Sequence, residues 1–406
     1  MSTGSQPTRL RRIALVTQGL GLGGGVPTVA RWLHDGLESI GGYTVDLHNL
    51  AASSRDMHSR RIVRPDTWFR KSLRSPFDEH LGAQHWGANL VEFEPMRYRP
   101  RAELVRALRG YDLIQVVAGG AALASAVTTT GPPVVLQVAT TLSWERQSRR
   151  AATSAGIAMW QDAMTAVASR SELRALRDVN AVLVENDVML SFVVDAGQSN
   201  VVKAPPGVDT EWFCPSVAGW NRRGYLLSVC RLSDRRKRLD KLIRAYRELT
   251  RIDAGAPKLV LAGRGELSSE VRRLIGSAGL GSSVVIRQDV GRDELIELYQ
   301  GASVYVQTSD EEGLGMSVLE AMASGLPVVA SDTAGARECV VQGVTGWIVQ
   351  QYPEQAFAGA FAGRVSDTLA YFGPAMAASA RERCKDVFST NVTLARFTAA
   401  YDGLLA

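Results

Sequence analysis

The sequence predicts an α/β protein built from two doubly wound, Rossmann-like domains that face each other across a cleft. Short apolar runs typical of buried strands alternate with amphipathic, helix-like segments along the chain. The first run, 13–16, leads through a glycine-rich turn into a helix-like segment over 28–40, and a second series of runs begins after 205–209. With 406 residues, the chain is long enough for two domains of ordinary size.

Each predicted strand is an apolar run bounded by turn-forming residues. The runs fall on residues 13–16, 113–117, 133–138 and 181–185 in the first half, and on 225–229, 258–263 and 304–307 in the second. Residues 239–250 are predicted to be helical because apolar residues recur there at helical spacing. We therefore expect a first domain over 1–204, a second over 205–385, and a C-terminal helix over 386–406 that packs back on the first domain.

Composition narrows the class of protein. Lys and Arg outnumber Asp and Glu by 46 − 41 = 5, which suits an anionic small molecule or surface and is too small an excess to indicate nucleic acid. The four cysteines are far apart, so a zinc knuckle, a redox motif and a disulfide framework lack support. The apolar run at 13–16 is too short for a signal-peptide core, and Gly and Pro interrupt the uncharged stretch 113–144. A cytoplasmic protein is expected.

One segment differs from its surroundings. Residues 55–74 hold seven basic side chains and the pair Trp68-Phe69; the basic residues are Arg55, Arg60, Arg61, Arg64, Arg70, Lys71 and Arg74. A solvated loop and a surface for an anionic acceptor or a membrane headgroup layer are both compatible with this composition. Membrane association is therefore left open.

Residues 309–330 are the most informative stretch for function. The predicted strand 304–307 runs into an acidic, glycine-bearing turn, and a helix is expected to begin near Gly315 or Met316. Amides at a helix start favour a phosphate, so a phosphate cradle is predicted from Gly313, Leu314, Gly315, Met316 and Ser317. Glu320 can accept hydrogen bonds from a ribose diol and Glu312 from sugar hydroxyls, which together describe a nucleotide-diphosphate-sugar. The alternative is an exposed acidic turn with a capped helix.

This stretch resembles the Glu-(seven residues)-Glu signature of family-4 retaining glycosyltransferases, which adopt the GT-B architecture of two Rossmann-like domains. The first Glu of the signature falls on Glu312 and the second on Glu320. The segments 205–215, 259–265 and 333–346 also follow the family pattern, so the resemblance covers 205–350 and, with fewer motifs, 13–40.

The resemblance also implies roles for basic residues and glycines. Arg231 and Lys237 align with the family's Arg and Lys, which neutralise a diphosphate leaving group, and with Glu312 they are the implied catalytic residues. The loop Gly23-Gly24-Gly25-Val26 resembles the family's Gly-Gly motif, so Gly24 and Gly25 are implied to face the donor diphosphate. Two positions depart from the pattern, because Pro206 stands where Asn is usual and Ala139 stands where many members carry a His. Candidates for acceptor contact there are Thr140, Thr141, Ser143, Trp144 and Glu145.

The implied function is a retaining glycosyltransferase of the hexosyltransferase type. It moves a sugar from a nucleotide-diphosphate-sugar, most often a UDP-sugar, to an acceptor hydroxyl of a small molecule, glycan or lipid. The second domain would hold the donor, with its base near 286–290, and the first would hold the acceptor. No Asp-x-Asp motif is present, so neither a metal nor a cofactor besides the co-substrate is expected, and front-face attack requires no protein nucleophile. The alternatives are a GT-B epimerase or phosphorylase and a catalytically silent nucleotide-sugar binder.

Overall fold

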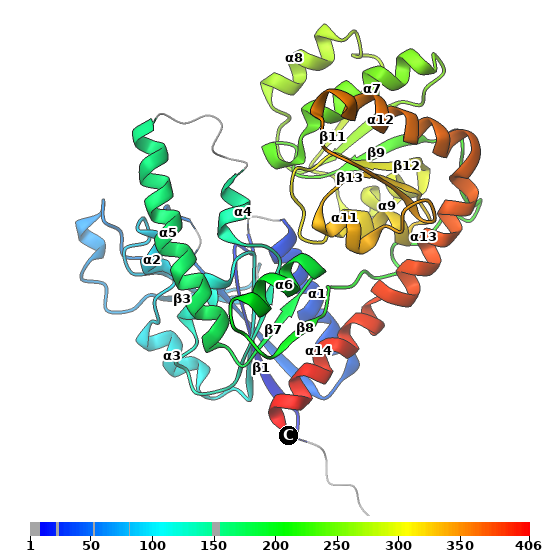
Figure 1. The fold of residues 1–406 in the computed structure, drawn as a ribbon. Helices are drawn as coiled ribbons and strands as arrows, with labels where there is room; N and C mark the ends of the chain where they lie inside the picture. Colours follow the sequence, from blue (N-terminus) through cyan, green and yellow to red (C-terminus); the bar gives the residue numbers. More distant parts are fainter. Residues whose placement is uncertain (1–8, 22–23, 52, 81, 148–154) are drawn as a thin grey trace, which may run out of the picture. The chain divides into compact units, whose positions relative to one another are not determined.

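The computed structural model describes residues 9–21, 24–51, 53–80, 82–147 and 155–406 (Figure 1). Contacts within the chain divide it into two compact units. The first unit comprises residues 1–206 together with 393–406, and the second comprises 207–392. The chain therefore leaves the first unit once and returns to it at its C-terminal end.

The first unit is built on an eight-stranded sheet with the strand order β3-β4-β2-β1-β5-β6-β7-β8. All neighbouring strands run parallel except β3 and β4. The strands are β1 (Arg11–Gln18), β2 (Tyr43–Leu50), β3 (Arg74–Asp78), β4 (Ala83–Trp86), β5 (Leu113–Ala118), β6 (Val134–Val138), β7 (Ala181–Val184) and β8 (Val201–Lys203). The helices are α1 (Gly25–Ile40), η1 (Pro65–Thr67), α2 (Glu94–Arg97), α3 (Ala102–Leu108), η2 (Ala121–Ala126), α4 (Leu142–Gln147), α5 (Ala155–Asp178) and α6 (Asp187–Asp195).

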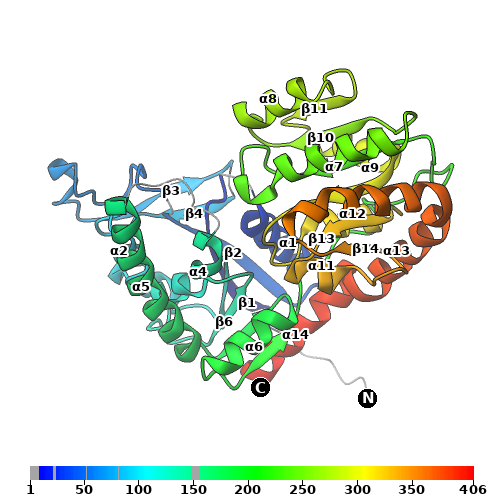
Figure 2. The ribbon, with the colours of Figure 1, turned by 45° about the horizontal axis from the view of Figure 1, so that its top comes forward.

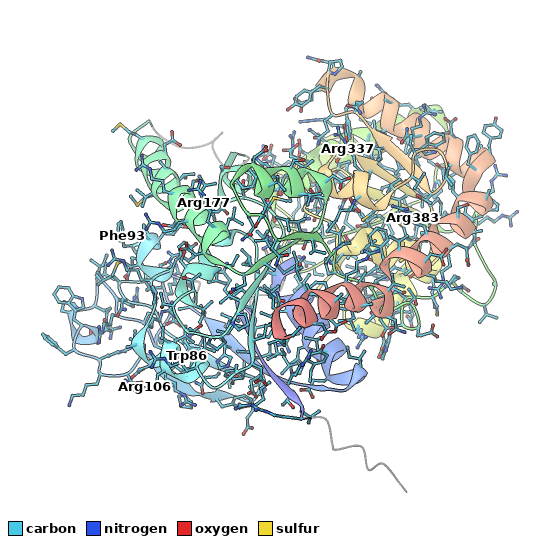
Figure 3. The ribbon with its side chains drawn as sticks, turned by 60° about the horizontal axis from the view of Figure 1, so that its bottom comes forward. Trp86, Phe93, Arg106, Arg177, Arg337 and Arg383 are labelled. Atoms are coloured by element: carbon cyan, nitrogen blue, oxygen red, sulfur yellow. The ribbon has the colours of Figure 1, made fainter. Side chains whose placement is uncertain are left out.

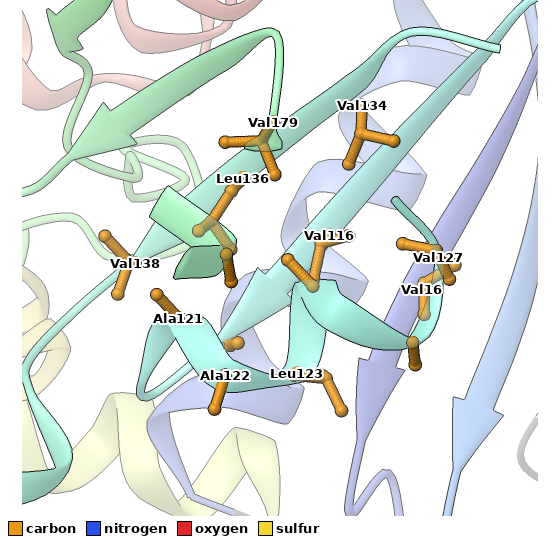
Figure 4. Close-up of a cluster of buried hydrophobic side chains, with 14 of the residues drawn as sticks. Val16, Val116, Ala121, Ala122, Leu123, Val127, Val134, Leu136, Val138 and Val179 are labelled. Carbon is orange, nitrogen blue, oxygen red and sulfur yellow. The ribbon is translucent and has the colours of Figure 1, made fainter. Parts of the chain in front are cut away.

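Alternate residues of the central strands point to opposite faces of this sheet, as strand geometry requires. On one face Val16, Val116 and Leu136 pack against η2, where Leu123 is 2% exposed (Figure 4). The uncharged stretch 113–144 therefore supplies two buried strands and the short helix that covers them.

The opposite face is covered by α1 and by the C-terminal helix α14 (Thr390–Leu405). The buried Tyr401 hydroxyl donates to Gln115 Oε1 in β5 at 2.8 Å, and the rings of Phe397 and Trp32 meet edge to face. A Cβ on Gly36 of α1 would lie 2.6 Å from Leu394, so glycine lets the two helices approach closely. These contacts hold the end of the chain on the first unit.

The second unit has a six-stranded, fully parallel sheet with the order β11-β10-β9-β12-β13-β14. Its strands are β9 (Tyr225–Val229), β10 (Leu259–Gly263), β11 (Val284–Gln288), β12 (Ala302–Gln307), β13 (Val328–Ser331) and β14 (Gly346–Val349). Its helices are η4 (Arg235–Lys237), α7 (Leu239–Ile252), α8 (Ser269–Ser277), α9 (Arg292–Gly301), α10 (Met316–Ala323), α11 (Ala334–Cys339), α12 (Glu354–Asp367), η5 (Thr368–Phe372) and α13 (Gly373–Phe388). The strand order reverses between β9 and β12, which makes this the topological switch point.

Helices cover both faces of the second sheet (Figure 2). One apolar cluster joins the sheet to α7, α8 and α12, and the other joins it to α9, α10, α11 and α13. On the second face, Arg383 of α13, which is labelled in Figure 3, lies at the end of α11. It donates to the carbonyls of Glu338 and Cys339, both at 2.8 Å. This cation satisfies carbonyls that a helix end leaves free.

The predicted fold class of two α/β, Rossmann-like units with parallel sheets is confirmed. The seven predicted runs agree with β1, β5, β6, β7, β9, β10 and β12 to within two residues at each end, whereas the other strands of the two sheets were not predicted. The first helix starts at Gly25, three residues before the predicted start. The predicted C-terminal helix is divided into α13 and α14, with residues 393–406 in the first unit. Within the described residues, no helix is long and apolar enough to cross a membrane.

Candidate active site

The two loops predicted to carry the chemistry leave neighbouring strands at the switch point of the second sheet. The segment 230–238 follows β9, and the segment 308–315 follows β12. In open α/β sheets, ligands bind beyond the carboxyl ends of the strands at such a point, because the two loops diverge there and leave a crevice. The fold therefore brings Arg231 and Lys237 to the same edge as Glu312 and Glu320.

Lys237 and Glu312 form an ion pair across these loops. Lys237 Nζ lies 2.6 Å from Glu312 Oε2, and both side chains are more than four-fifths buried. Burial alone would lower the pKa of the Lys237 ammonium, but the charge of Glu312 and its hydrogen bond raise that pKa above its ordinary value. Ser309 Oγ also donates to the same carboxylate oxygen at 3.1 Å. A fixed, charged ammonium thus stands at the switch point.

Arg231 lies in the same segment as Lys237 but pairs with a different carboxylate. Its Nη2 lies 2.9 Å from Asp234 Oδ2, and its side chain is 44% exposed. Asp234 also binds Arg236 at 2.9 Å; burial would raise the pKa of the Asp234 carboxyl, but Arg236 holds it at about 2. Asp234 is therefore ionised at neutral pH and keeps the two guanidinium groups beside the end of β9.

The start of α10 has the geometry of an anion site. Gly315 is the N-cap in a left-handed conformation (φ 91°), which favours glycine, and Met316 is the first helical residue. The side chain of Ser317 is held by a hydrogen bond, because the buried Tyr305 hydroxyl donates to Ser317 Oγ at 2.8 Å. Leu314 packs into the apolar core, so only its backbone is left for a ligand. Gly313 lies in the same loop, next to Glu312.

Glu320 lies one turn into α10 and is held by a buried tyrosine. Tyr299, which is fully buried in α9, donates its hydroxyl to Glu320 Oε2 at 2.8 Å. Burial raises the pKa of the Glu320 carboxyl to about 7, although the Tyr299 hydrogen bond opposes that shift. The carboxylate that is predicted to bind ribose therefore titrates near neutral pH.

The remaining predicted residues belong to the first unit. Gly24 is the N-cap of α1 with φ 110°, a value that L side chains rarely adopt, and its carbonyl accepts from Thr28 Oγ1 at 2.9 Å. A Cβ on Gly25 would meet nothing within 4 Å, so its backbone is open on that side. Gly23 lies outside the described residues. Ala139 follows β6, where the amide of Thr140 donates to the Gly119 carbonyl at 2.9 Å.

Sequence reasoning missed two groups that act on this site. The buried Tyr299 and Tyr305 donate to Glu320 and Ser317, and Asp310 accepts from both Arg238 and Lys241. The tyrosines carry no sequence signal, because their effect depends on packing between α9, β12 and α10. The second group carries no sequence signal either, because its contacts join segments about 70 residues apart.

Comparison with known proteins supports the reading of the second unit. Residues 217–375 match the model of the family described as Glycosyl transferases group 1. A GDP-mannose-dependent alpha-(1-6)-phosphatidylinositol monomannoside mannosyltransferase of Mycolicibacterium smegmatis is 34% identical over 161 residues, which are 36% of this chain and 42% of that protein. A D-inositol 3-phosphate glycosyltransferase of Acidothermus cellulolyticus is 32% identical over 40% of each chain. The chain thus spans less than half the length of these relatives.

Solved structures extend the likeness to the whole fold. Sucrose-phosphate synthase from Thermosynechococcus elongatus aligns with a TM-score of 0.69 at 20% identity, covering 97% of this chain and 99% of that one. Anabaena HepE in complex with UDP and glucose aligns with a TM-score of 0.70 at 16% identity, covering 97% of this chain and all of that one. The chain therefore has the two-domain α/β fold of these glycosyltransferases, and its residues 217–375 match the model of the group 1 glycosyl transferases.

Proposed function

We propose that this chain is a retaining glycosyltransferase that moves a sugar from a nucleotide-diphosphate-sugar to an acceptor hydroxyl. The observation that carries the proposal is the buried Lys237–Glu312 pair at the switch point of the second sheet, beside the glycine-capped start of α10. A cation, helix-start amides and carboxylates within one short stretch suit a diphosphate flanked by hydroxyl-bearing sugars. The second unit would bind the donor and the first unit the acceptor.

The proposed reaction follows from these groups. The acceptor oxygen bonds to the anomeric carbon on the face that the diphosphate leaves, the carbon–oxygen bond to the phosphate breaks, and the acceptor proton passes to the leaving phosphate oxygen. Lys237 and Arg231 neutralise the charge that develops on the diphosphate, together with the amides at the start of α10. Glu312 accepts from hydroxyls of the transferred sugar.

The names of the relatives guide the choice of donor. The mycobacterial relative is named as GDP-mannose-dependent, whereas HepE was solved with UDP and glucose. The test is donor hydrolysis, which needs no acceptor, with GDP-mannose, UDP-glucose and dTDP-glucose, each with and without EDTA. We expect one donor to be turned over and EDTA to leave its rate unchanged. Isomerisation of the donor would instead indicate an epimerase, and release of a sugar-1-phosphate from a glycan would indicate a phosphorylase. Tight nucleotide binding without turnover would indicate a silent binder.

Donor affinity is expected to depend on pH through Glu320. Ribose hydroxyls donate to the ionised carboxylate, so binding favours the deprotonated form, and affinity should rise with pH through about 7 and level off above it. Between about pH 6 and pH 8, Kd for the donor should fall up to tenfold. Both phosphates of a sugar-nucleotide are esterified, so the donor keeps its own charge over this range. Calorimetric titration at several pH values checks this, and Glu320→Gln should bind weakly with a flat profile; an unchanged slope in that variant would remove Glu320 from the ribose site.

The segment 55–74 is the candidate surface for an anionic acceptor or a membrane headgroup layer. Five of its seven cations are paired within the first unit: Arg60 and Arg70 donate to backbone carbonyls, Arg61 binds Glu92 at 3.0 Å, Arg64 binds Asp66 at 2.8 Å, and Arg74 lies over the Trp86 ring. Apolar side chains are left outside, with Phe69 88%, Met57 77% and Val63 66% exposed. Arg55 and Lys71 are exposed in the same segment.

We therefore propose peripheral membrane contact through these exposed apolar side chains and the cations beside them. The full chain should sediment with vesicles that contain phosphatidylglycerol more than with pure phosphatidylcholine vesicles. Phe69→Ser should weaken that binding several-fold, since it removes a large apolar group from the bilayer boundary. The matched control is Phe372→Ser, an exposed phenylalanine of the second unit. Equal binding to both kinds of vesicle, or to neither, would count against this contact.

A further inference from the structure

Next to the Lys237–Glu312 pair, a second set of ion pairs joins the two loops that carry it. Arg238 Nη1 lies 3.0 Å from both carboxylate oxygens of Asp310, and Lys241 Nζ lies 2.9 Å from Asp310 Oδ1. The Asp310 amide also donates to the Arg236 carbonyl at 2.9 Å. The loop after β9 and the loop after β12 are thus bound through side chains and backbone at one place, which we call the loop clasp: Arg238, Lys241 and Asp310.

Arg238 occupies an unusual backbone conformation in this clasp. Its φ and ψ are both 46°, the left-handed region, which is disfavoured for a residue with a Cβ. The conformation is held from several sides, because the guanidinium binds Asp240 and Glu354 as well as Asp310, and the Arg238 carbonyl accepts from Thr308 Oγ1 at 3.0 Å. Arg238 lies between Lys237, the last residue of η4, and the first residue of α7. The backbone turn at Arg238 therefore fixes how Lys237 is oriented relative to α7.

The side chain of Lys241 is buried, so this part of the loop clasp lies in the interior of the second unit. It is 5% exposed, lies over the Phe357 ring with Nζ 5.6 Å from the centroid, and donates to Gln351 Oε1 at 3.3 Å. Gln351 in turn donates to the carbonyls of Asp310 and Asp332. A buried ammonium that loses its carboxylate is costly, so the arrangement favours one position of the Asp310 loop.

We propose that Arg238, Lys241 and Asp310 are positioning residues that hold Lys237 against Glu312. Lys237 immediately precedes Arg238, and Glu312 follows Asp310 by two residues, so a shift at the clasp passes directly to the pair. A misplacement of about 1 Å can reduce turnover roughly a hundredfold. The importance of the clasp for catalysis rests on the proposed function, but its effect on Lys237 can be measured without any substrate.

The experiment is competitive lysine acetylation of the full chain with sulfosuccinimidyl acetate, read by peptide mass spectrometry. The variants are Arg238→Gly, which accepts the left-handed conformation without strain, Arg238→Ala, which does not, and Asp310→Asn. Lys237 should be acetylated slowly in the native chain, because it is buried and paired, while the exposed Lys258 is the internal standard. All three variants should raise the Lys237 rate about fivefold or more relative to Lys258, since a freed ammonium is exposed and loses its proton more readily.

Arg244→Ala is the matched control. Arg244 binds Asp240 at 3.2 Å from the exposed side of α7 and does not reach Asp310, so its removal should leave Lys237 labelling unchanged. Melting curves must show that each variant is folded, and Arg238→Gly relieves backbone strain, which favours folding. If Arg238→Gly and Asp310→Asn both label Lys237 at the native rate, the clasp does not position it and the proposal is overturned.

A second readout separates this inference from the proposed function. In donor hydrolysis, clasp variants should lower kcat with little change in KM, and Arg238→Lys should recover part of the loss. If no donor is turned over by the native chain, the proposed function fails while the labelling result still decides the clasp. A fall in turnover with unchanged Lys237 labelling would overturn the clasp and leave the proposed function standing.

Discussion

Lys237→Ala is expected to lower the rate of donor turnover by about 10²- to 10³-fold. The ammonium is buried beside Glu312 at 2.6 Å and is held in the charged form. In the proposed reaction it would stabilise the developing diphosphate charge without reorganising. Because this charge develops in the transition state, kcat should fall more than KM rises. Steady-state donor hydrolysis measures both constants.

The design includes a matched lysine and a double variant. Lys258→Ala removes an exposed lysine at the start of β10 and should leave turnover unchanged. Glu312→Ala should also lose orders of magnitude, and the double variant Lys237→Ala/Glu312→Ala should lose less than the product of the two, because both act on one site. Near-native turnover of Lys237→Ala and Glu312→Ala would show that these roles are assigned wrongly.

Gly263→Ala is expected to destabilise the second unit by roughly 3–5 kcal/mol. Gly263 ends β10 with φ 139°, and a Cβ there would lie 1.8 Å from the Cys230 carbonyl oxygen. That carbonyl belongs to the exit of β9, from which the segment with Arg231 and Lys237 begins. The added methyl group must push this exit aside, so nucleotide binding should weaken together with stability.

Thermal unfolding followed by circular dichroism checks this expectation. The melting temperature of the second unit should fall by roughly 10 °C. Gly276→Ala is the matched control, because a Cβ at that position in α8 would meet nothing within 4 Å and should stabilise the helix by up to about 1 kcal/mol. If Gly263→Ala melts with the native protein, the close approach of β10 to the β9 exit does not constrain this fold.

The fold was predictable because its central strands are buried on both faces. Residues 225–229 and 302–307 contain unbroken apolar runs that helices cover from both sides, so the sequence pattern and the burial agree. The pattern did not predict β3, the one antiparallel strand, since Arg74–Asp78 is polar and half exposed. Helix starts were less certain, because glycine at positions 24, 25 and 315 permits several ways into a helix.

The candidate site was predictable where one short stretch holds it. Glu312, Gly315 and Glu320 follow a strand at fixed spacing, and Lys237 follows another, so a resemblance could identify them; their roles stay predictions. The sequence could not pair Asp310 with Arg238 and Lys241, because that contact joins loops about 70 residues apart. Nor could it place Tyr299 on Glu320, which depends on how α9 packs against α10.

A crystal structure of the protein soaked with the donor that it hydrolyses would test the central claim most directly. We expect the diphosphate to contact Lys237, Arg231 and the amides at the start of α10, with ribose hydroxyls on Glu320 and the transferred sugar on Glu312. A donor bound at another edge of the second sheet, with its glycosyl group away from residues 312–320, would contradict this expectation.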